Sequence, residues 1–335
     1  MARPPLPDWA IWLFAFGYLA GYAPYSALTK LLSRGTIPAL GPAIPGLSLL
    51  PLSSIASVIC AVLLLVVTGW WRKTTRHTVA GVTFHGPGRY TLLSGLCSSA
   101  IILTTTLAYT FEGISIVFMM LLLRGGVLLI APAVDLVSRR KVRWFSWVAL
   151  GLSLAALLLA LDPNSGFKLS LAATADIGIY LLAYFIRLRL MSKLAKGSDE
   201  DNLRYFAEEQ MVSSPAALLA LALMALGSGP ASDELRRGFT EVPFGPAAAA
   251  VVLVGVLSQS NGVFGGLVLL DKRENSFAVP VNRASSILAG LLATLVLWGF
   301  FGEKTPGFRE ILGALMILVA VLFLSFGPRW SRPMT

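Results

Sequence analysis

The chain has 335 residues, of which 56% are hydrophobic and only 13% are charged. A soluble domain of this length usually has about 25% charged residues, so the composition excludes an ordinary water-soluble protein and indicates a membrane protein. The formal net charge is +10. Its basic residues gather in short segments between apolar runs, so we interpret the charge as a signal of membrane topology and expect no nucleic-acid partner.

Apolar stretches of the ~20 residues that a membrane-spanning helix needs recur along the whole chain. Lipid offers the backbone no hydrogen-bond partner, so such stretches should be helices; the alternating polar pattern of a membrane β-barrel is absent. The sequence therefore predicts an all-α integral membrane protein with ten transmembrane helices. These are expected at residues 9–32, 49–71, 90–110, 113–137, 144–161, 169–193, 203–227, 247–270, 276–300 and 309–326.

Basic residues crowd into alternate connections between the predicted helices. By the positive-inside rule, both termini are then expected in the cytoplasm. The first span is too long for a cleavable signal and is expected to be retained. High Ala, Leu, Gly and Arg content favours a bacterial inner membrane. The basic connections contain Arg72, Lys73, Arg76 and Arg89, then Arg139, Arg140, Lys141 and Arg143, then Lys193, Lys196 and Arg204.

Cysteine and histidine residues give no sign of a metal or redox centre. Cys60 and Cys97 fall within predicted spans and are expected to be buried thiols and not a disulfide. His77 and His85 lie in the basic connection after the second span without further ligand residues, which favours a solvated loop. We expect no metal and no cofactor.

The second half of the chain matches the first at a shift of 162 positions (from 112 to 274). This predicts two five-helix repeats, residues 1–165 and 166–335. An odd number of spans per repeat inverts the second copy, as in alternating-access carriers. The alternative is chance similarity between two hydrophobic halves, since Arg283 falls one turn before the position beneath Arg124. The matched pairs are Glu112 with Glu274, Tyr18 with Tyr180, Tyr22 with Tyr184, and Gly151 with Gly313.

Two arginines interrupt long apolar runs, Arg124 within 114–130 and Arg283 within 276–298. A charge at that depth is costly unless it faces the interior of the bundle or a water-filled cavity. The guanidinium fork matches a carboxylate or phosphate and stays charged when desolvated, so the pair predicts a binding site for an anion. The alternative is a structural ion pair with Glu112 or Glu274, or bonds to backbone carbonyls.

Tyrosines of the first and sixth spans are candidates for the wall of the cavity. Tyr18 and Tyr22 are one helical turn apart on the first span, where Pro24 is expected to kink the helix, and Tyr180 and Tyr184 repeat that spacing on the sixth. Phenols on one face can stack on a ring or donate to phosphate oxygens. The alternative is a packing stripe of aromatic residues.

Polar residues of the third and eighth spans are further candidates. Ser99 belongs to a run of hydroxyl residues that could equally be packing contacts between helices. The run 258–261 sweeps around a helix and includes Gln259 and Asn261, whose amide groups need several partners. Polar groups within the membrane mark transport pathways, so we favour a cavity for these two residues.

Charged residues cluster where the sixth span ends and the seventh begins. Arg187 and Arg189 are expected to extend toward the cytoplasmic surface. Glu208 or Glu209 could neutralise one of these arginines or take up a proton for coupling. The Gly- and Pro-rich connections 35–51 and 227–246 are expected to be irregular external segments.

Three short motifs resemble the drug/metabolite transporter superfamily. Leu123-Arg124-Gly125-Gly126-Val127, with Ser115 before it and Arg139-Arg140-Lys141 after it, is similar to the fourth helix of that superfamily and its loop. Val281-Asn282-Arg283-Ala284 resembles the Leu-Asn-Lys stretch of nucleotide-sugar transporters, with Arg in place of Lys, and Phe301-Gly302-Glu303-Lys304 resembles the superfamily's Phe-Gly-Glu turn. The resemblance implies an alternating-access carrier in which Asn282 and Arg283 contact phosphates.

We therefore expect a secondary transporter or antiporter for a small organic anion, phosphorylated as in a nucleotide sugar or sugar phosphate. The alternatives are an exporter of amino acids or other metabolites and a lipid-phosphate translocator. A membrane-embedded enzyme is less favoured, because the sequence has no HExxH, P-loop or Gly-x-Ser-x-Gly motif. The expected partners are the anionic substrate and membrane lipids, and a homodimer is left open.

Overall fold

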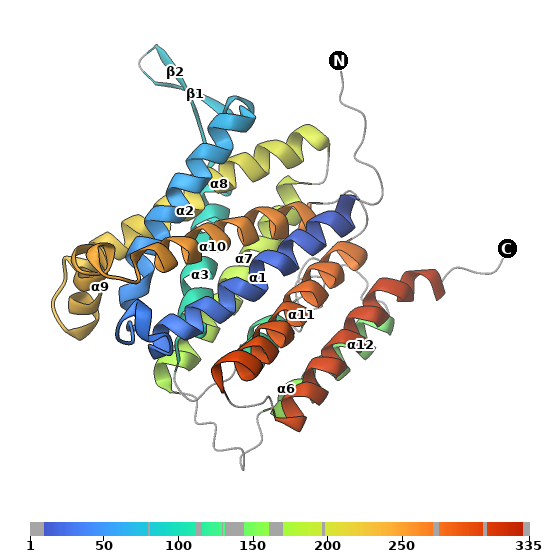
Figure 1. Cartoon of the computed structure of the whole chain (residues 1–335). Coiled ribbons are helices and arrows are strands. Elements are labelled where there is room, and N and C mark those ends of the chain that lie inside the picture. The colour runs from blue at the N-terminus through green and yellow to red at the C-terminus, as the bar shows by residue number, and fades with distance from the viewer. Residues whose placement is uncertain are drawn as a thin grey trace.

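The computed structural model describes residues 10–79, 81–111, 116–128, 130, 144–160, 170–195, 198–270, 275–303 and 307–330. Helices account for most of this part of the chain (Figure 1). In the first half they are α1 (Ala10–Arg34), α2 (Gly46–Thr68), α3 (Arg89–Ala108), α4 (Ile116–Met120) and α6 (Trp144–Ala160). In the second half they are α7 (Leu171–Leu194), α8 (Asp199–Ala225), α9 (Pro230–Thr240), α10 (Ala248–Leu269), α11 (Asn275–Phe301) and α12 (Phe308–Trp330).

Among the described residues, five helices are long and apolar enough to cross a membrane, namely α2, α3, α7, α10 and the segment Val281–Phe301 of α11. Their outward faces carry large apolar side chains that no neighbouring element covers; Val67 of α2, for example, is 82% exposed. A soluble protein rarely exposes apolar surface on this scale, because water does not solvate it favourably. The structure thus confirms a largely helical protein of membrane type.

A short β-hairpin interrupts the helical pattern. Strands β1 (Thr75–Val79) and β2 (Val82–Gly86) pair antiparallel between α2 and α3, with the turn at Gly81 in the left-handed region at φ +83°. A solvated loop was expected around His77 and His85, and the structure shows this connection to be a paired hairpin. His77 stacks on Phe84 and His85 packs edge-on against Trp71, with ring centroids 5.6 and 5.5 Å apart. Such side-chain contacts between and beside strands stabilise a hairpin.

The connection 227–246 is also more ordered than the sequence predicted, since it contains α9 and a short 3₁₀ turn, η5 (Val242–Phe244). Leu235 of α9 is fully buried, and Gly238 lies so close to α2 that an added Cβ would be 2.6 Å from the carbonyl oxygen of Ser48. The start of α2 therefore holds α9, at the end of the bundle opposite the hairpin (Figure 1).

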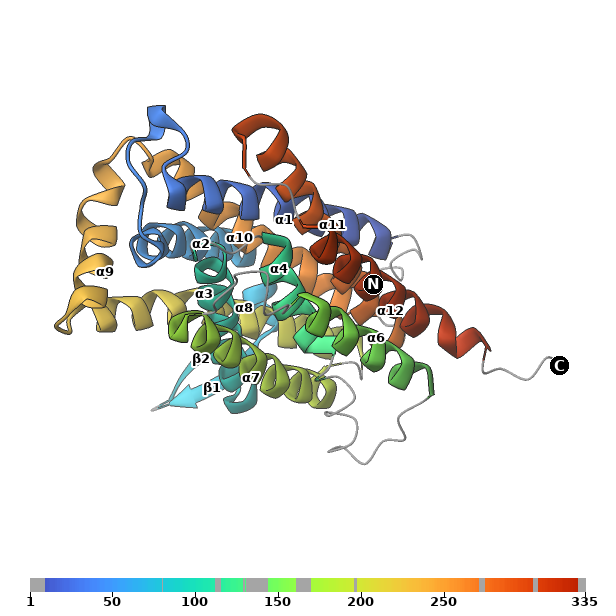
Figure 2. The same cartoon turned by 90° about the horizontal axis from the view of Figure 1, so that it is seen from below.

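Close helix contacts depend on small residues at the crossings. Helix α1 runs antiparallel to α10, with Gly17 against the ring of Phe264 and Gly21 against Asn261. Gly255 of α10 meets the backbone of α2 at Ser53, so a side chain there would collide with that backbone. Helices α6 and α12 lie side by side at one edge of the bundle (Figure 2).

Candidate functional site

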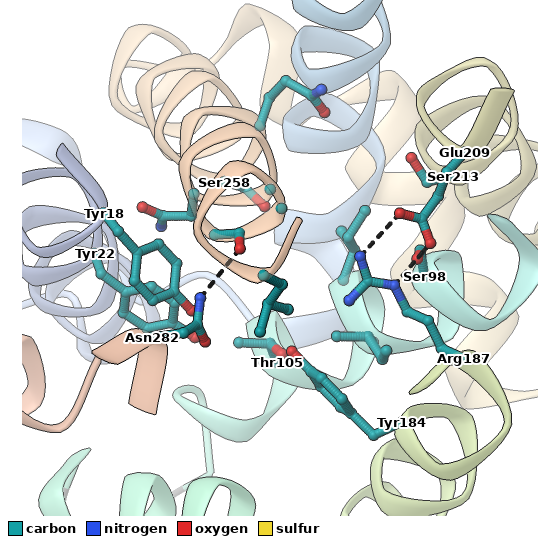
Figure 3. Close-up of a pocket in the computed structure, with 18 of the residues that line it drawn as sticks. Tyr18, Tyr22, Ser98, Thr105, Tyr184, Arg187, Glu209, Ser213, Ser258 and Asn282 are labelled. Carbon is teal, nitrogen blue, oxygen red and sulfur yellow. Dashed lines mark hydrogen bonds and ion pairs between the residues drawn. The ribbon is translucent and has the colours of Figure 1, made fainter. Parts of the chain in front are cut away.

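A polar cavity with an empty volume of about 710 Å³, part of it open to solvent, lies between helices of both halves (Figure 3). Its wall is built by α1, α3, α7, α8, α10, α11 and a π-helical turn, η3 (Leu121–Gly125), that continues α4. Single π turns within α-helices often occur at functional sites, because they redirect one side chain. Here the turn contains Arg124.

Arg124 lies on the cavity wall and is only 2% exposed. Its Nη1 donates to the hydroxyl groups of Tyr180 and Tyr184 at 2.6 and 3.3 Å, and its Nη2 donates to the hydroxyl of Tyr22. The rings of Tyr22 and Tyr180 also face the guanidinium carbon, with centroids at 5.0 and 5.8 Å. No carboxylate of the described residues pairs with Arg124, so its charge is held by phenols alone.

Arg283 is fully buried behind the cavity wall and does not line it. The ring of Tyr184, which does line the cavity, covers the guanidinium group with its centroid 4.7 Å from the central carbon. None of the three guanidinium nitrogens has a hydrogen-bond partner within the described chain. The neighbouring residue Asn282 reaches the cavity and donates to the carbonyl of Gly265 at 3.2 Å. The two predicted arginines are thus close to one tyrosine but differ in exposure to the cavity.

Phenols from both halves surround the same region. Tyr18 and Tyr22 line the cavity from α1, together with Tyr25, whose hydroxyl lies 2.7 Å from Thr106 Oγ1. Tyr109, which the sequence analysis did not select, donates to the Tyr22 hydroxyl at 3.1 Å. Tyr22, Tyr180 and Tyr184 all contact Arg124. Of the four tyrosines proposed for the cavity wall, Tyr18, Tyr22 and Tyr184 line the cavity and Tyr180 does not.

Arg187 is the main correction to the predicted site. It was expected to extend to the cytoplasmic surface, but it is buried on the cavity wall and paired with Glu209 (Figure 3). Its Nε and Nη2 donate to the two carboxylate oxygens at 2.7 and 2.9 Å. Arg187 lies three residues after Tyr184, on the same helical face, so it turns inward with the tyrosine. Glu208 or Glu209 was predicted as a partner for Arg187 or Arg189, and the structure pairs Arg187 with Glu209.

Glu208 and Glu209, both predicted as coupling residues, have different positions. Glu209 lines the cavity, whereas Glu208 joins α8 to the start of α3 and to the hairpin. Glu208 accepts hydrogen bonds from the backbone N–H groups of Thr75 and Gly88 at 2.8 and 2.9 Å. The hydroxyl groups of Thr75 and Thr91 donate to the same carboxylate. These contacts give Glu208 a structural role outside the cavity.

The amide residues of α10 line the cavity. Gln259 lines the cavity, donates to Gln210 Oε1 at 2.6 Å and accepts from Ser214 at 2.9 Å. Asn261 also lines the cavity and is 6% exposed, but neither atom of its amide group has a hydrogen-bond partner in the described part of the chain. A buried amide without partners costs free energy, so Asn261 is well placed to bind a ligand.

Ser99 is a packing residue in this structure, which favours the alternative interpretation for it. It donates to the carbonyl of Ser213 on α8 at 2.6 Å and does not line the cavity. Ser98 lines the cavity instead and donates to Glu209 at 2.8 Å. Neighbouring serines point in different directions on a helix, and only the position of α8 decides which one meets the cavity.

Several predicted features fall outside the described residues. These are Glu112, Glu274, Ser115, Lys304 and the basic turn 139–141. Among the residues that are described, no group of three or more His, Cys, Asp and Glu side chains is arranged to hold a metal ion. Both cysteines are free thiols.

Comparison with known proteins gives a fold but no function. No family model and no curated protein matches the chain. A crystal structure described only as that of a protein is similar over 97% of this chain and 99% of that chain, with a TM-score of 0.52 and 13% sequence identity. At that identity the similarity concerns the fold alone, so the same helical arrangement occurs in another protein of nearly equal length.

Proposed function

We propose that this chain is a secondary transporter for a small organic anion. The observation that carries the proposal is Arg124, a permanent cation on the wall of a polar cavity, held only by phenol oxygens within the described chain. Ionisable residues deep in a membrane bundle usually belong to a ligand pathway, because a charge that faces lipid costs several kcal/mol of free energy. A guanidinium with neutral partners keeps its full charge available for a carboxylate or phosphate.

Other groups near the cavity suit a phosphorylated anion. The amide groups of Asn261 and Asn282 and the hydroxyl groups of Tyr18 and Tyr22 can donate to phosphate or sugar oxygens. Arg283 adds positive potential from behind the Tyr184 ring, where few dipoles screen it. Together with the resemblance to nucleotide-sugar transporters, these groups favour a sugar phosphate or nucleotide sugar.

Ten membrane-spanning helices in two inverted repeats form part of the proposal. Two features of helix packing support it: α1 packs on α10 as α7 packs on α3, and α10 packs on α2 as α3 packs on α8. A two-fold exchange of the halves would convert each pair into the other. The stacking of Arg124 on Tyr22 and of Arg283 on Tyr184 supports the same exchange. Inverted repeats of this kind accompany alternating access.

On α10 the cavity lining lies toward one end of the bundle. It runs from Ser258 to Leu269, near the C-terminal end of that helix. At the opposite end, Lys30 donates to the carbonyl of Phe111 at 2.8 Å, and Arg34 forms an ion pair with Glu303. With the basic connections in the cytoplasm of a bacterial inner membrane, this is an inward-facing state.

Export of amino acids is a second candidate, favoured by one observation. The cavity contains a carboxylate, Glu209, as well as Arg124, so a zwitterion could place its carboxylate on Arg124 and its ammonium group on Glu209. The ion pair of Glu209 with Arg187 argues against this arrangement, because an ammonium group would have to compete with a bidentate guanidinium.

A thermal-shift experiment on the purified chain tests the proposal. Sugar phosphates, nucleotide sugars and amino acids are added separately, and a ligand that binds only the folded state raises the unfolding temperature. We expect stabilisation by phosphorylated anions, lost in Arg124→Gln and retained in the control Arg189→Gln, which alters an exposed residue of α7. Stabilisation by amino acids alone would favour the exporter, and phosphorylated anions binding equally to Arg124→Gln would contradict the anion site.

A further inference from the structure

The ion pair between Arg187 and Glu209 occupies a position that a substrate can reach. Both residues line the same cavity as Arg124, and they come from different helices, α7 and α8. Figure 3 shows the pair on the wall, with the carboxylate facing the fork of the guanidinium group. A pair that served only to join two helices would not need contact with the cavity.

Glu209 has hydrogen-bond donors besides Arg187. The hydroxyl groups of Ser94, Ser98 and Tyr205 lie 3.0, 2.8 and 3.4 Å from its Oε1. If Arg187 moved to another anion, these hydroxyl groups would still solvate the carboxylate, so the buried charge would not be left without partners. Arg187 is in the opposite situation, because both hydrogen bonds that it donates within the described residues go to Glu209.

The charges around the cavity favour an anionic ligand. Arg124, Arg187 and Arg283 carry three positive charges on or directly behind the wall, and Glu209 carries one negative charge, which leaves a net charge of +2. Uncompensated charge in a poorly hydrated site is unfavourable. A ligand with one phosphate, which carries up to about two negative charges at neutral pH, already offsets this charge. The expectation of two charged ends therefore rests on the two separate guanidinium groups of the wall, Arg124 and Arg187.

We propose that Arg187 is a second anion-binding group, which Glu209 occupies while the cavity is empty, and that the substrate is an anion with two charged ends. This inference rests on the proposed function, in which Arg124 holds one end. The other end replaces the carboxylate of Glu209 on the guanidinium fork, and Glu209 keeps hydroxyl donors from Ser98 and from the hydrogen-bonded pair Ser94 and Tyr205. Glu209 is then a built-in competitor that weakens the binding of anions.

Binding measurements on the full-length purified chain test this inference. The probes are a sugar monophosphate, the bisphosphate of the same sugar, with one phosphate at each end, and inorganic phosphate. In the unaltered protein we expect the bisphosphate to bind at least tenfold more tightly than the monophosphate. In Arg187→Gln the two should bind about equally, because no guanidinium group remains to bind the second charged end.

The variant Glu209→Gln distinguishes a carboxylate that competes with the ligand for Arg187 from one that only stabilises the fold. Removing the competing carboxylate should strengthen bisphosphate binding by about tenfold or more. This variant should be less stable than the unaltered protein, because Arg187 has lost its ion-pair partner, and added bisphosphate should restore its stability. If the ion pair were only structural, Glu209→Gln and Arg187→Gln should weaken bisphosphate binding equally. That result would overturn the inference. Arg189→Gln serves as the control, with binding unchanged.

A double variant covers the case in which a single substitution prevents folding. Arg187→Gln with Glu209→Gln leaves two amide groups that can bond to each other, so no buried charge remains unpaired. We expect this variant to bind the monophosphate and to lack the preference for the bisphosphate; a retained preference would refute the role of Arg187. Failure of every anion to bind the unaltered protein would instead contradict the proposed function.

Discussion

Arg283 has the least favourable environment of the residues near the cavity. It is fully buried, it stacks on Tyr184, and none of its nitrogens has a hydrogen-bond partner in the described chain. Leaving a buried charge without an ion-pair partner costs several kcal/mol. Arg124 is buried to nearly the same degree but donates to three phenol oxygens. The two arginines should therefore respond differently to substitution.

We expect Arg283→Met to raise the free energy of unfolding by about 1–4 kcal/mol, because an apolar side chain of similar length avoids the buried charge. Transport should nevertheless fall, since the positive potential behind Tyr184 is lost. Arg124→Met should instead lower stability, because three phenol groups lose their partner. Unfolding temperatures of the two variants in detergent measure the difference. Equal destabilisation by both substitutions would show that Arg283 has favourable contacts in the fold.

The individual residues show what sequence can and cannot predict about this site. Apolar runs interrupted by Arg124 and Arg283 indicate functional positions without any structure, because the cost of a charge in lipid is a general rule. The sequence cannot reveal that Tyr184 separates Arg283 from the cavity, or which of Arg187 and Arg189 pairs with which of the two glutamates. Both facts depend on which helices become neighbours.

At the scale of elements, the start of α3 depends on a side chain from α8. Gly88 precedes α3 and supplies no side-chain cap, so the orphan N–H groups of the first turn need an external acceptor. Glu208 provides it by accepting from Gly88 N and Thr91 Oγ1, and it also holds Thr75 of the hairpin. The carboxylate of Glu208 thus holds both the start of α3 and the hairpin in place.

Glu208→Ala should loosen the hairpin and the first turn of α3. The loss of several hydrogen bonds to a charged acceptor predicts a cost of about 1–3 kcal/mol. Hydrogen exchange of residues 75–91 should become faster, while anion binding in the cavity stays within about twofold. Unchanged exchange in this segment would contradict the structural role of Glu208, and loss of binding together with unchanged exchange would favour a coupling role.

The crossing of α10 and α2 requires a glycine. A Cβ at Gly255 would collide with the backbone of α2 at Ser53, whereas a Cβ at Gly262 of the same helix would meet nothing within 4 Å. Gly255→Ala should therefore destabilise the protein by about 1–3 kcal/mol through overpacking. Gly262→Ala should be neutral or slightly stabilising, because alanine is the better helix former. Equal unfolding temperatures for the two variants would show that the crossing tolerates a side chain.

Long apolar elements follow closely from the sequence. The predicted spans 90–110 and 247–270 correspond to α3, Arg89–Ala108, and α10, Ala248–Leu269. The hairpin and α9 were missed, because each is short and depends on contacts with other elements. The hairpin is held by Glu208, and α9 by its close approach to α2 at Gly238. Local patterns carry little information about such contacts.

At the scale of the whole molecule, the proposed alternating access would require the closed end of the bundle to open. Arg34 at the end of α1 pairs with Glu303 in the turn between α11 and α12, so the pair links the two halves. Helix α1 and this turn have to separate for the cavity to open at that end. The pair is partly exposed, so it should contribute modestly, about 1 kcal/mol or less.

Glu303→Gln should shift the carrier toward the oppositely facing state. A single cysteine introduced for Ser26, which is buried on α1, should then react several-fold faster with a membrane-impermeant thiol reagent applied from the periplasmic side. The background for this measurement lacks Cys60 and Cys97. An unchanged rate in Glu303→Gln would mean that the ion pair does not limit opening.

Counterflow in proteoliposomes tests the central claim most directly. Vesicles containing the purified chain are loaded with an unlabelled sugar phosphate, and uptake of the labelled compound is followed in the unaltered protein, Arg124→Gln and Arg189→Gln. We expect accelerated uptake in the unaltered protein and in Arg189→Gln, and at least a tenfold reduction in Arg124→Gln. Equal uptake by Arg124→Gln would contradict the assignment of this arginine as the group that binds the transported anion.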